Sequence, residues 1–529
     1  MSETLPVLAA LLAALAISAP IARRLRISEP IVLALVGLAL AFVPGLPRRA
    51  LDPELILVVF LPPILYADAF HTSWVDFQRW LRPILMLAIG LVALTILVVG
   101  IVAHALLPEL PWAVCFVIGA IVSPTDTVAV QSVIEKLRVP RRTTAILGGE
   151  SLVNDATGLV GVQIGVAVVL SGAFEAGEVA MRFATVAGGG IVVGLVIGLV
   201  FSWLNRVARS TELLFTLSLL SPYLAYWIAH EFEASGVLAV VVAGFLVAWR
   251  IHLIPAEARI QLYSAWGLMT WALNGLSFIF IGLEAPRLVR ETEVGTTSNL
   301  LVAGLVLSAV VILVRIAWVF PGAYLPLLLS PALRKREGGF PPVRGVLLVS
   351  WCGVRGVISL AAALAIPVTL DDGTPFPGRQ AMLACVLCVI LVTLFVQGLT
   401  LGPLVRLLGI RGDEDSEVEV RAAREAMLEA GIRRLDAFCS ETSCPLSVHH
   451  WRTHMADELV TLRDEDKDQR DQARARIAVS RDVRRAVADE QASELLKLRD
   501  SGRINDRTYL QLQLDLDRER HAGRQEEAA

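Results

Sequence analysis

The chain has 529 residues, of which 55% are hydrophobic, and its mean hydropathy is +0.64. A composition this apolar excludes an ordinary soluble protein and is typical of a chain that crosses a membrane many times. The formal net charge is −3, but the charged residues are distributed unevenly along the chain.

Charge divides the sequence into two regions. Residues 1–410 contain 26 Lys and Arg and 23 Asp and Glu, whereas residues 411–529 contain 21 and 27. We therefore predict a membrane domain over 1–410 and a charged helical tail over 411–529, with helices at 417–438 and 451–500. The acidic balance of the tail argues against a nucleic-acid partner, and its pattern identifies no other partner.

Thirteen apolar segments follow one another through the membrane domain. Their approximate limits are 4–22, 27–43, 54–70, 83–107, 111–134, 143–171, 178–205, 211–230, 234–250, 264–283, 297–328, 345–368 and 380–409. The predicted fold class is an all-α membrane protein of about 13 transmembrane helices with a helical tail.

The loops between these segments alternate in basic residues. Loops after odd-numbered segments hold 17 Lys and Arg, and loops after even-numbered segments hold five. Because basic loops stay on the cytoplasmic side, we expect the N-terminus outside and the tail in the cytoplasm. No basic region precedes the first apolar segment, so we expect that segment to be retained as a membrane helix.

The fifth and twelfth segments are each interrupted at a charge. Pro124 precedes Asp126 in the fifth, and Gly353 and Gly356 flank Arg355 in the twelfth. The two segments hold corresponding places in the halves formed by segments 1–6 and 8–13. Interrupted helices in matching positions predict two inverted repeats with a binding site near the membrane midplane.

The sixth segment carries two acids at membrane depth. On a helix, Glu150, Ser151, Asn154 and Asp155 share one face, and the glycines at 158, 161 and 165 continue it. Charged groups in a membrane mark ion paths, and small residues let another helix approach closely. We therefore expect a second helix to cross this face and complete an ion site.

Four motifs resemble those of the sodium/proton exchanger family, in the monovalent cation:proton antiporter superfamily. They are LPPILY at 61–66, SPTD at 123–126, GGESLVND at 148–155 and GVRG at 353–356. One departure is that Ala67 stands where the family often has an acid, and Asp68 follows it. The resemblance implies exchange of Na⁺ or Li⁺ for H⁺ in a cell membrane, a homodimer with a sliding core, and no enzyme activity or cofactor.

In this interpretation Asp155 is the carrier of either a cation or a proton. Asp126, Ser151 and the carbonyl of Thr125 supply further oxygen ligands for Na⁺. Burial disfavours a bare carboxylate, so the empty site takes up a proton. Asn154 lies beside the carrier and cannot titrate. We therefore predict electroneutral exchange of one H⁺ per Na⁺.

Two further charges are assigned to structure. Glu150 and Arg355 are expected to form a buried ion pair that joins the sixth segment to the twelfth. Arg315 is a second buried cation, and the sequence does not identify its partner.

Other functions fit the sequence less well. A K⁺/H⁺ antiporter of the same fold is the nearest alternative, because ligand types alone do not separate Na⁺ from K⁺. A cation channel needs a repeated ring of pore-lining groups, which one chain of inverted halves lacks. An intramembrane hydrolase needs Ser151 to be activated by a base, and the residues around it lack the second glycine of a nucleophile elbow.

Overall fold

The computed structural model describes most of the chain. The described residues are 4–25, 27–43, 53–137, 139–172, 175–208, 210–291, 294–370, 373–410, 414–441, 445–463 and 467–501, with 503, 508, 512 and 513. They contain helices and one isolated bridge between Thr369 and Pro375, but no named β-strand. The chain forms two compact units, residues 1–412 and 413–529. Residues 411–413, where the tail was predicted to begin, lie outside the described residues.

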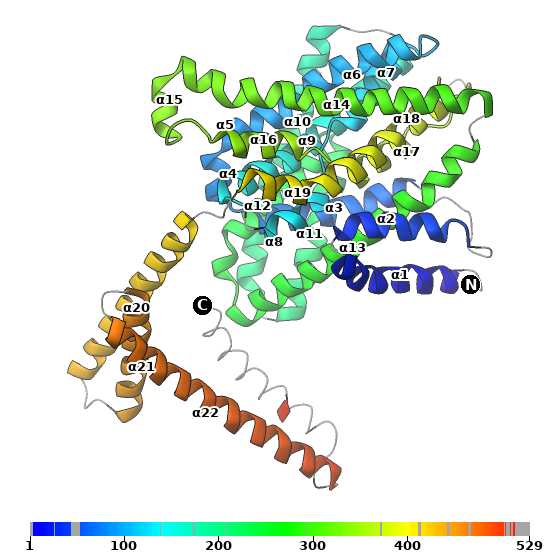
Figure 1. Ribbon diagram of the computed structural model, residues 1–529. Coiled ribbons are helices and arrows are strands. Elements are labelled where there is room, and N and C mark those ends of the chain that lie inside the picture. Colours follow the sequence, from blue (N-terminus) through cyan, green and yellow to red (C-terminus); the bar gives the residue numbers. More distant parts are fainter. Residues whose placement is uncertain are drawn as a thin grey trace. The chain divides into compact units, whose positions relative to one another are not determined.

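The first unit opens with helices that lead up to and through the sixth apolar segment (Figure 1). They are α1 (Thr4–Leu25), α2 (Glu29–Leu40), α3 (Pro53–His71), α4 (Trp74–Arg79), α5 (Leu81–Leu85), the π-helix η1 (Met86–Leu91), α6 (Val92–Leu106), α7 (Trp112–Val122), α8 (Val128–Lys136) and α9 (Arg141–Ser171).

The rest of this unit continues with α10 (Ala176–Val207), α11 (Thr211–Glu231), α12 (Gly236–Trp249), the 3-10 helix η2 (Ile251–Leu253), α13 (Ala256–Glu291), α14 (Val294–Leu329), α15 (Pro331–Arg336), α16 (Val343–Trp351), α17 (Val357–Leu364), α18 (Arg379–Val392), the π-helix η3 (Thr393–Gln397) and α19 (Gly398–Leu408).

The lengths of these helices agree with the predicted membrane crossings. Eight helical stretches of described residues are long and apolar enough to span a membrane, and four shorter apolar helices lie at Glu29–Leu40, Val58–His71, Trp112–Val122 and Gly236–Trp249. The interrupted pair α16 and α17 occupies the predicted twelfth segment. The predicted all-α membrane fold is confirmed.

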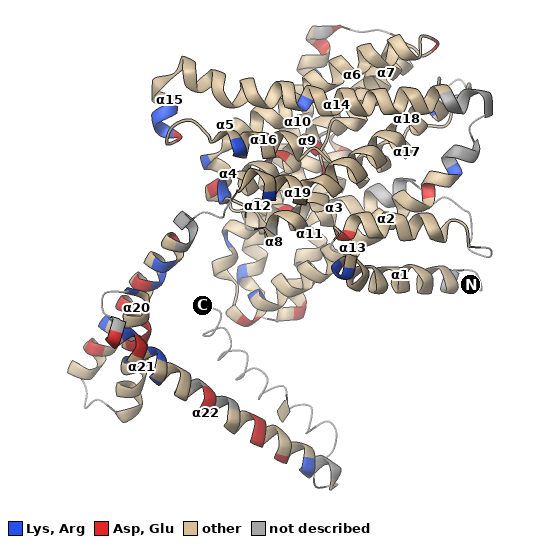
Figure 2. Cartoon of the chain, in the orientation of Figure 1, with Lys and Arg blue, Asp and Glu red and all other residues tan. Residues whose placement is uncertain are grey.

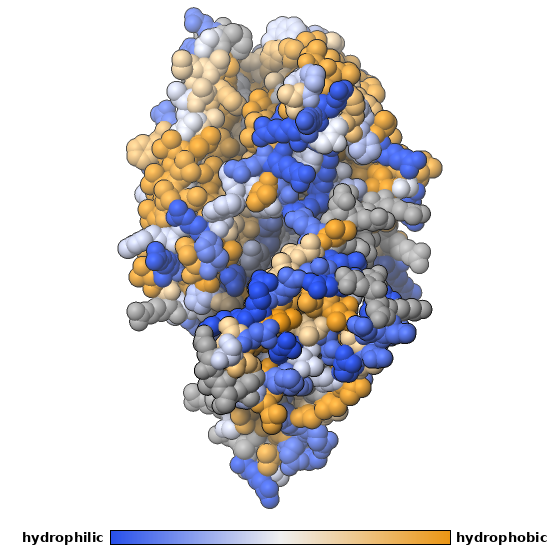
Figure 3. Space-filling view, turned by 90° about the vertical axis from the view of Figure 1, so that its left-hand side faces the viewer, coloured by the Kyte–Doolittle hydropathy of each residue, from blue (hydrophilic) through white to orange (hydrophobic). Residues whose placement is uncertain are grey.

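Charge follows the same division. Figure 2 shows mostly uncharged ribbon along the long helices of the first unit and frequent charges along α20, α21 and α22. Large apolar side chains such as Val192, Leu268 and Leu313 are exposed on the outside of the first unit. Figure 3 shows hydrophobic patches toward the upper left and upper right of one face, with hydrophilic residues between them. In a membrane protein these surfaces face lipid.

Packing sorts the membrane helices into two groups. The first helix group is α1–α3 with α10–α13, in which α12 packs on α3, α10 and α11, and α13 packs on α2. The second helix group is α6, α7, α9, α14 and α16–α18, in which α7 packs on α6 and α9, and α14 packs on α16 and α18. The second group therefore contains helices from both interrupted spans, α7 from one and α16 and α17 from the other.

The named helices among the described residues of the second unit are α20 (Glu414–Glu441), α21 (Leu446–Arg463) and α22 (Lys467–Asp500). The helix predicted over 451–500 is thus wrong in extent, because α21 ends at Arg463 and α22 begins at Lys467. Ion pairs join neighbouring helices: Arg452 Nε lies 2.6 Å from Asp436 Oδ1, and Arg476 Nε lies 2.9 Å from Asp457 Oδ2.

Candidate ion-binding site

The two interrupted spans meet through their backbones. Helix α7 ends at Val122 and α8 begins at Val128, while α16 ends at Trp351 and α17 begins at Val357. Between these helices, the N–H of Asp126 donates to the carbonyl of Val354 over 2.8 Å. Backbone groups released by one break are therefore partly satisfied by the other, as burial in a membrane requires.

The carboxylate of Asp126 lies against Gly356, which has no side chain. Its Oδ1 accepts the N–H of Val128 at 2.8 Å. A Cβ atom built on Gly356 would lie only 1.7 Å from Asp126 Oδ2. The glycine after Arg355 therefore makes room for the carboxylate of the other break.

Helix α9 presents the predicted polar face to this crossing. Glu150, Ser151, Asn154 and Asp155 are all buried. Further along the same face, a Cβ atom on Gly158 would lie 2.4 Å from Pro124 Cγ, and one on Gly165 would lie 2.6 Å from Val117 Cγ2. The prediction that a second helix crosses the glycine face is confirmed, and that helix is α7.

A small cavity of about 40 Å³ adjoins the crossing, and it is called the ion cavity below. Three carboxylates line it, from Asp68, Asp126 and Asp155. Thr125 and Ser151, two other residues of the predicted ligand set, also line it. This volume accommodates a dehydrated ion with very little water.

Three other polar residues of the cavity were not assigned from the sequence. Asp68 was left without a role because it stands one residue beyond the expected position, yet it lines the cavity. Asn274 and Ser359 also line it and were missed. An amide inside the apolar tenth segment was a signal that could have identified Asn274.

Asn154 is placed differently from the other candidates. It is absent from the described lining of the ion cavity, and its Nδ2 donates to Thr125 Oγ1 at 2.8 Å. Ser151 Oγ donates to the Thr125 carbonyl at 2.9 Å, and Thr125 Oγ1 donates to Glu150 Oε1 at 3.2 Å. Three residues of α9 therefore hold Thr125 in place.

The expected ion pair between Glu150 and Arg355 is wrong. Glu150 pairs with Arg315 of α14, whose Nη2 donates to Glu150 Oε2 at 2.8 Å while Nη1 contacts Oε1. Arg315 also donates from Nε to the carbonyl of Val349 at 3.1 Å. The pair joins the sixth span to the eleventh, and it supplies the partner that the sequence did not identify for Arg315.

Arg355 is satisfied by backbone oxygen. Its Nε donates to the carbonyl of Val122 at 2.8 Å, and its Nη1 donates to the carbonyl of Gly353. Both acceptors lie where a helix has just ended, at the C-termini of α7 and α16. A cation at this position neutralises the negative ends of two helix dipoles and occupies carbonyls that have lost their helical partners.

A second, larger cavity of about 230 Å³ adjoins the site, and it is called the vestibule below. Its lining is polar, with His71, Asp76, Gln131 and Arg141 among its residues, and Arg141 Nε lies 2.8 Å from Asp76 Oδ2. Asp68 lines both the vestibule and the ion cavity. Its carboxyl group therefore stands where the two spaces approach each other.

Two crossing interrupted helices with buried carboxylates define this protein as a secondary transporter of cations. Residues 8–407 match the family described as "Sodium/hydrogen exchanger, transmembrane". The chain belongs to this family, and the predicted resemblance is confirmed.

Individual proteins show the same relationship. The chain is 34% identical to an uncharacterized Na⁺/H⁺ exchanger of Mycobacterium tuberculosis over 97% of this chain and 95% of that protein. It is 33% identical to a sodium, potassium, lithium and rubidium/H⁺ antiporter of Bacillus subtilis over 70% of this chain and 56% of that protein. Its fold resembles the sodium proton antiporter MjNhaP1 of Methanocaldococcus jannaschii, with a TM-score of 0.60, 21% identity, and coverage of 77% of this chain and 100% of that one.

Proposed function

We propose that this chain exchanges Na⁺, or Li⁺, for H⁺ across the cell membrane, with Asp155 as the carrier. The observation that carries the proposal is the convergence of Asp68, Asp126 and Asp155 on one small cavity beside the crossed breaks. Carboxylate, hydroxyl and carbonyl oxygens are the ligands that hard monovalent cations prefer.

Exchange follows from competition for one carboxylate. A bound Na⁺ neutralises Asp155, with Asp126, Ser151 and Thr125 as further oxygen ligands. The Thr125 carbonyl accepts a hydrogen bond from Ser151 and keeps a second lone pair for the ion. When the cation leaves, the buried carboxylate takes up a proton, because burial disfavours its charged form.

The proposed stoichiometry is one H⁺ per Na⁺. Asn154 cannot titrate, and Glu150 is engaged in an ion pair with Arg315 and does not line the ion cavity as described. Asp126 and Asp68 are the remaining acids of the cavity on which the stoichiometry depends, and in this scheme neither makes a net proton transfer during the cycle. Transport then moves no net charge, and a membrane voltage, worth about 2.3 kcal/mol per charge per 100 mV, does not drive it.

The test uses proteoliposomes in which K⁺ and valinomycin set the voltage. We expect the Na⁺-driven proton flux, and the pH gradient that it reaches, to be the same at every voltage. An equilibrium pH gradient that shifts as required for one net charge per cycle refutes the stoichiometry. If Asp68→Asn abolishes that shift, then Asp68 supplies the second proton.

Selectivity is the finer part of the proposal. We assign Na⁺ as the preferred ion, and K⁺/H⁺ exchange is the alternative, supported by the Bacillus subtilis relative, which is named as an antiporter of potassium as well as sodium. Proton flux measured with NaCl, LiCl, KCl and RbCl in turn separates the two. A flux with KCl that equals or exceeds the flux with NaCl rejects the assignment.

We also propose a homodimer that contributes to pH and sodium homeostasis, with the N-terminus outside and the tail in the cytoplasm. The orientation rests on the excess of basic residues in alternate loops. An impermeant thiol reagent applied to whole cells should label Thr374→Cys and leave Arg334→Cys unlabelled. The reverse labelling overturns the orientation, and a monomeric mass in light scattering overturns the dimer.

A further inference from the structure

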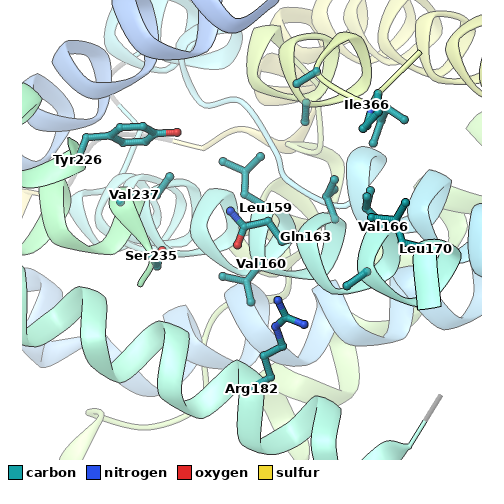
Figure 4. Close-up of a pocket in the computed structure, with 16 residues that line it drawn as sticks. Leu159, Val160, Gln163, Val166, Leu170, Arg182, Tyr226, Ser235, Val237 and Ile366 are labelled. Carbon is teal, nitrogen blue, oxygen red and sulfur yellow. The ribbon is translucent and has the colours of Figure 1, made fainter. Parts of the chain in front are cut away.

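A cleft of about 430 Å³ lies between the two helix groups, apart from the ion cavity (Figure 4). Helix α9 of the second group contributes Leu159, Gln163 and Val166 to one wall. Helix α10 of the first group contributes Arg182, and Ile366 follows the end of α17. This space is called the Arg182 cleft below.

The cleft combines a largely apolar wall, which also holds Gln163, Tyr226 and Ser235, with a single charge. Of its 16 described lining residues, Arg182 is the only one that carries a charge. Figure 4 shows its guanidinium directed toward Val160 and Gln163, with Val166, Leu170 and Ile366 beyond them. A ligand that fits both features has an anionic group attached to a long apolar chain.

The position of Arg182 in its helix agrees with such a ligand. Arg182 lies six residues after the start of α10 at Ala176, which corresponds to about 9 Å of helix. Arginine near the end of a membrane helix extends its charged group to the level of the lipid headgroups. Here that group reaches into a cleft of the protein, where a lipid phosphate can accept bidentate hydrogen bonds.

The obvious alternative is that the cleft conducts the transported cation. Leu159 and Gln163 follow Asp155 by one and two helical turns, so the cleft lies further along the carrier's own helix face. However, the guanidinium of Arg182 repels a cation at 4 Å by about 1 kcal/mol in water, and by more in a less polar environment. An anion is attracted by the same group.

We infer that the Arg182 cleft binds an anionic phospholipid. The phosphate pairs with Arg182, and one acyl chain lies along Leu159, Val166 and Ile366. Because the cleft is formed by both helix groups, a bound lipid contacts both and stabilises their present arrangement. The inference concerns lipid binding alone, so a test of it does not depend on which ion the protein transports.

The experiment measures lipid binding to the purified, delipidated full-length chain by native mass spectrometry and thermal unfolding. The probes are phosphatidylglycerol, phosphatidylcholine and inorganic phosphate. We expect phosphatidylglycerol to bind and to raise the unfolding temperature. Arg182→Gln should weaken this binding about tenfold or more, the effect of losing hydrogen bonds to a charged group, and Arg182→Lys should restore part of it.

Two further variants separate the cleft from general charge effects. Arg206→Gln removes an exposed cation at the other end of α10 and should bind phosphatidylglycerol as the unmodified chain does. Ala167→Trp fills the cleft while keeping Arg182, and it should weaken binding as strongly as Arg182→Gln does. Unchanged binding by Arg182→Gln, equal binding of phosphatidylcholine, or competition by millimolar inorganic phosphate each overturns the proposal.

Discussion

The two interrupted spans have similar backbones and opposite chemistry. The break between α7 and α8 carries Asp126, and the break between α16 and α17 carries Arg355. The acid lines the ion cavity, whereas the arginine donates to the carbonyls of Val122 and Gly353. One half of the fold thus contributes an acid to the cavity, and the other contributes a cation that donates to backbone carbonyls of both halves.

This difference shows how a membrane protein can keep unwound backbone in its interior. Each break releases carbonyls that would cost several kcal/mol if they were left unpaired in hydrocarbon. Arg355 donates to carbonyls from both breaks. The Asp126 carboxylate can only accept, and its Oδ1 takes the N–H of Val128 while the side chain lines the ion cavity.

The largest effect is expected at the carrier. Asp155→Asn should abolish Na⁺-driven proton flux while leaving the protein folded, because an amide of the same shape cannot titrate. Asp126→Asn should act similarly, with residual low-affinity binding. Asp436→Asn, an exposed acid of the tail, is the control and should transport normally. Proteoliposomes of Asp155→Asn that still dissipate a pH gradient on Na⁺ addition contradict the assignment.

The next largest effect is expected on stability, and it distinguishes Arg315 from Arg355 as the partner of Glu150. Glu150→Ala or Arg315→Ala should each lower the free energy of unfolding by about 3–5 kcal/mol, because each leaves one buried charge alone. The double variant should lose less than the sum of the two.

Glu150→Ala combined with Arg355→Ala serves as the comparison, and its losses should be closer to additive. Thermal unfolding in detergent measures both cycles. A larger coupling of Glu150 to Arg355 than to Arg315 would show that the ion pair is assigned to the wrong arginine.

A smaller effect is expected where the two breaks touch. Gly356→Ala places a methyl group against the Asp126 carboxylate and should reduce exchange at least about tenfold, with a stability loss of about 1–3 kcal/mol. Gly148→Ala is the matched control, since no atom lies within 4 Å of a Cβ atom there. Equal activity of the two variants would mean that Asp126 does not need its present position.

The smallest effect concerns the support of the second break. The N–H of Arg355 donates to Thr393 Oγ1 at 3.1 Å, and both residues are buried. Thr393→Val removes this acceptor and should cost about 1–3 kcal/mol of stability. Thr95→Val is the control, because the Thr95 hydroxyl donates to the carbonyl of Leu91, one turn earlier along the same span, at 2.7 Å. A stability loss in Thr393→Val no larger than in Thr95→Val contradicts this role.

Local patterns were sufficient to predict the membrane helices, both breaks and the polar face of α9. The length of an apolar segment predicts a membrane helix, and Pro124 and the glycines around Arg355 predict the two breaks. Each of these signals affects only the backbone within a few residues, so each can be recognised from the sequence alone. The helix that crosses Gly158 was expected for the same reason, since a bare backbone predicts close packing.

Partners across the fold were not predictable in the same way. One glutamate and two arginines lie at membrane depth, and sequence spacing cannot show which arginine reaches Glu150. Backbone carbonyls proved to be the partners of Arg355, and carbonyls carry no sequence signal. Asp68 was similarly ambiguous, because its contribution depends on how α3 is turned against α9.

The hydrogen bond from the Asp126 N–H to the Val354 carbonyl involves no side-chain atom. Ordinary substitution at either position therefore leaves its donor and acceptor in place, except for proline at 126, which lacks the N–H. The two halves of the gene can thus accumulate changes independently without losing this connection. Selection for ion preference can therefore change the side chains of the cavity, while the backbone hydrogen bond that connects the two halves is retained.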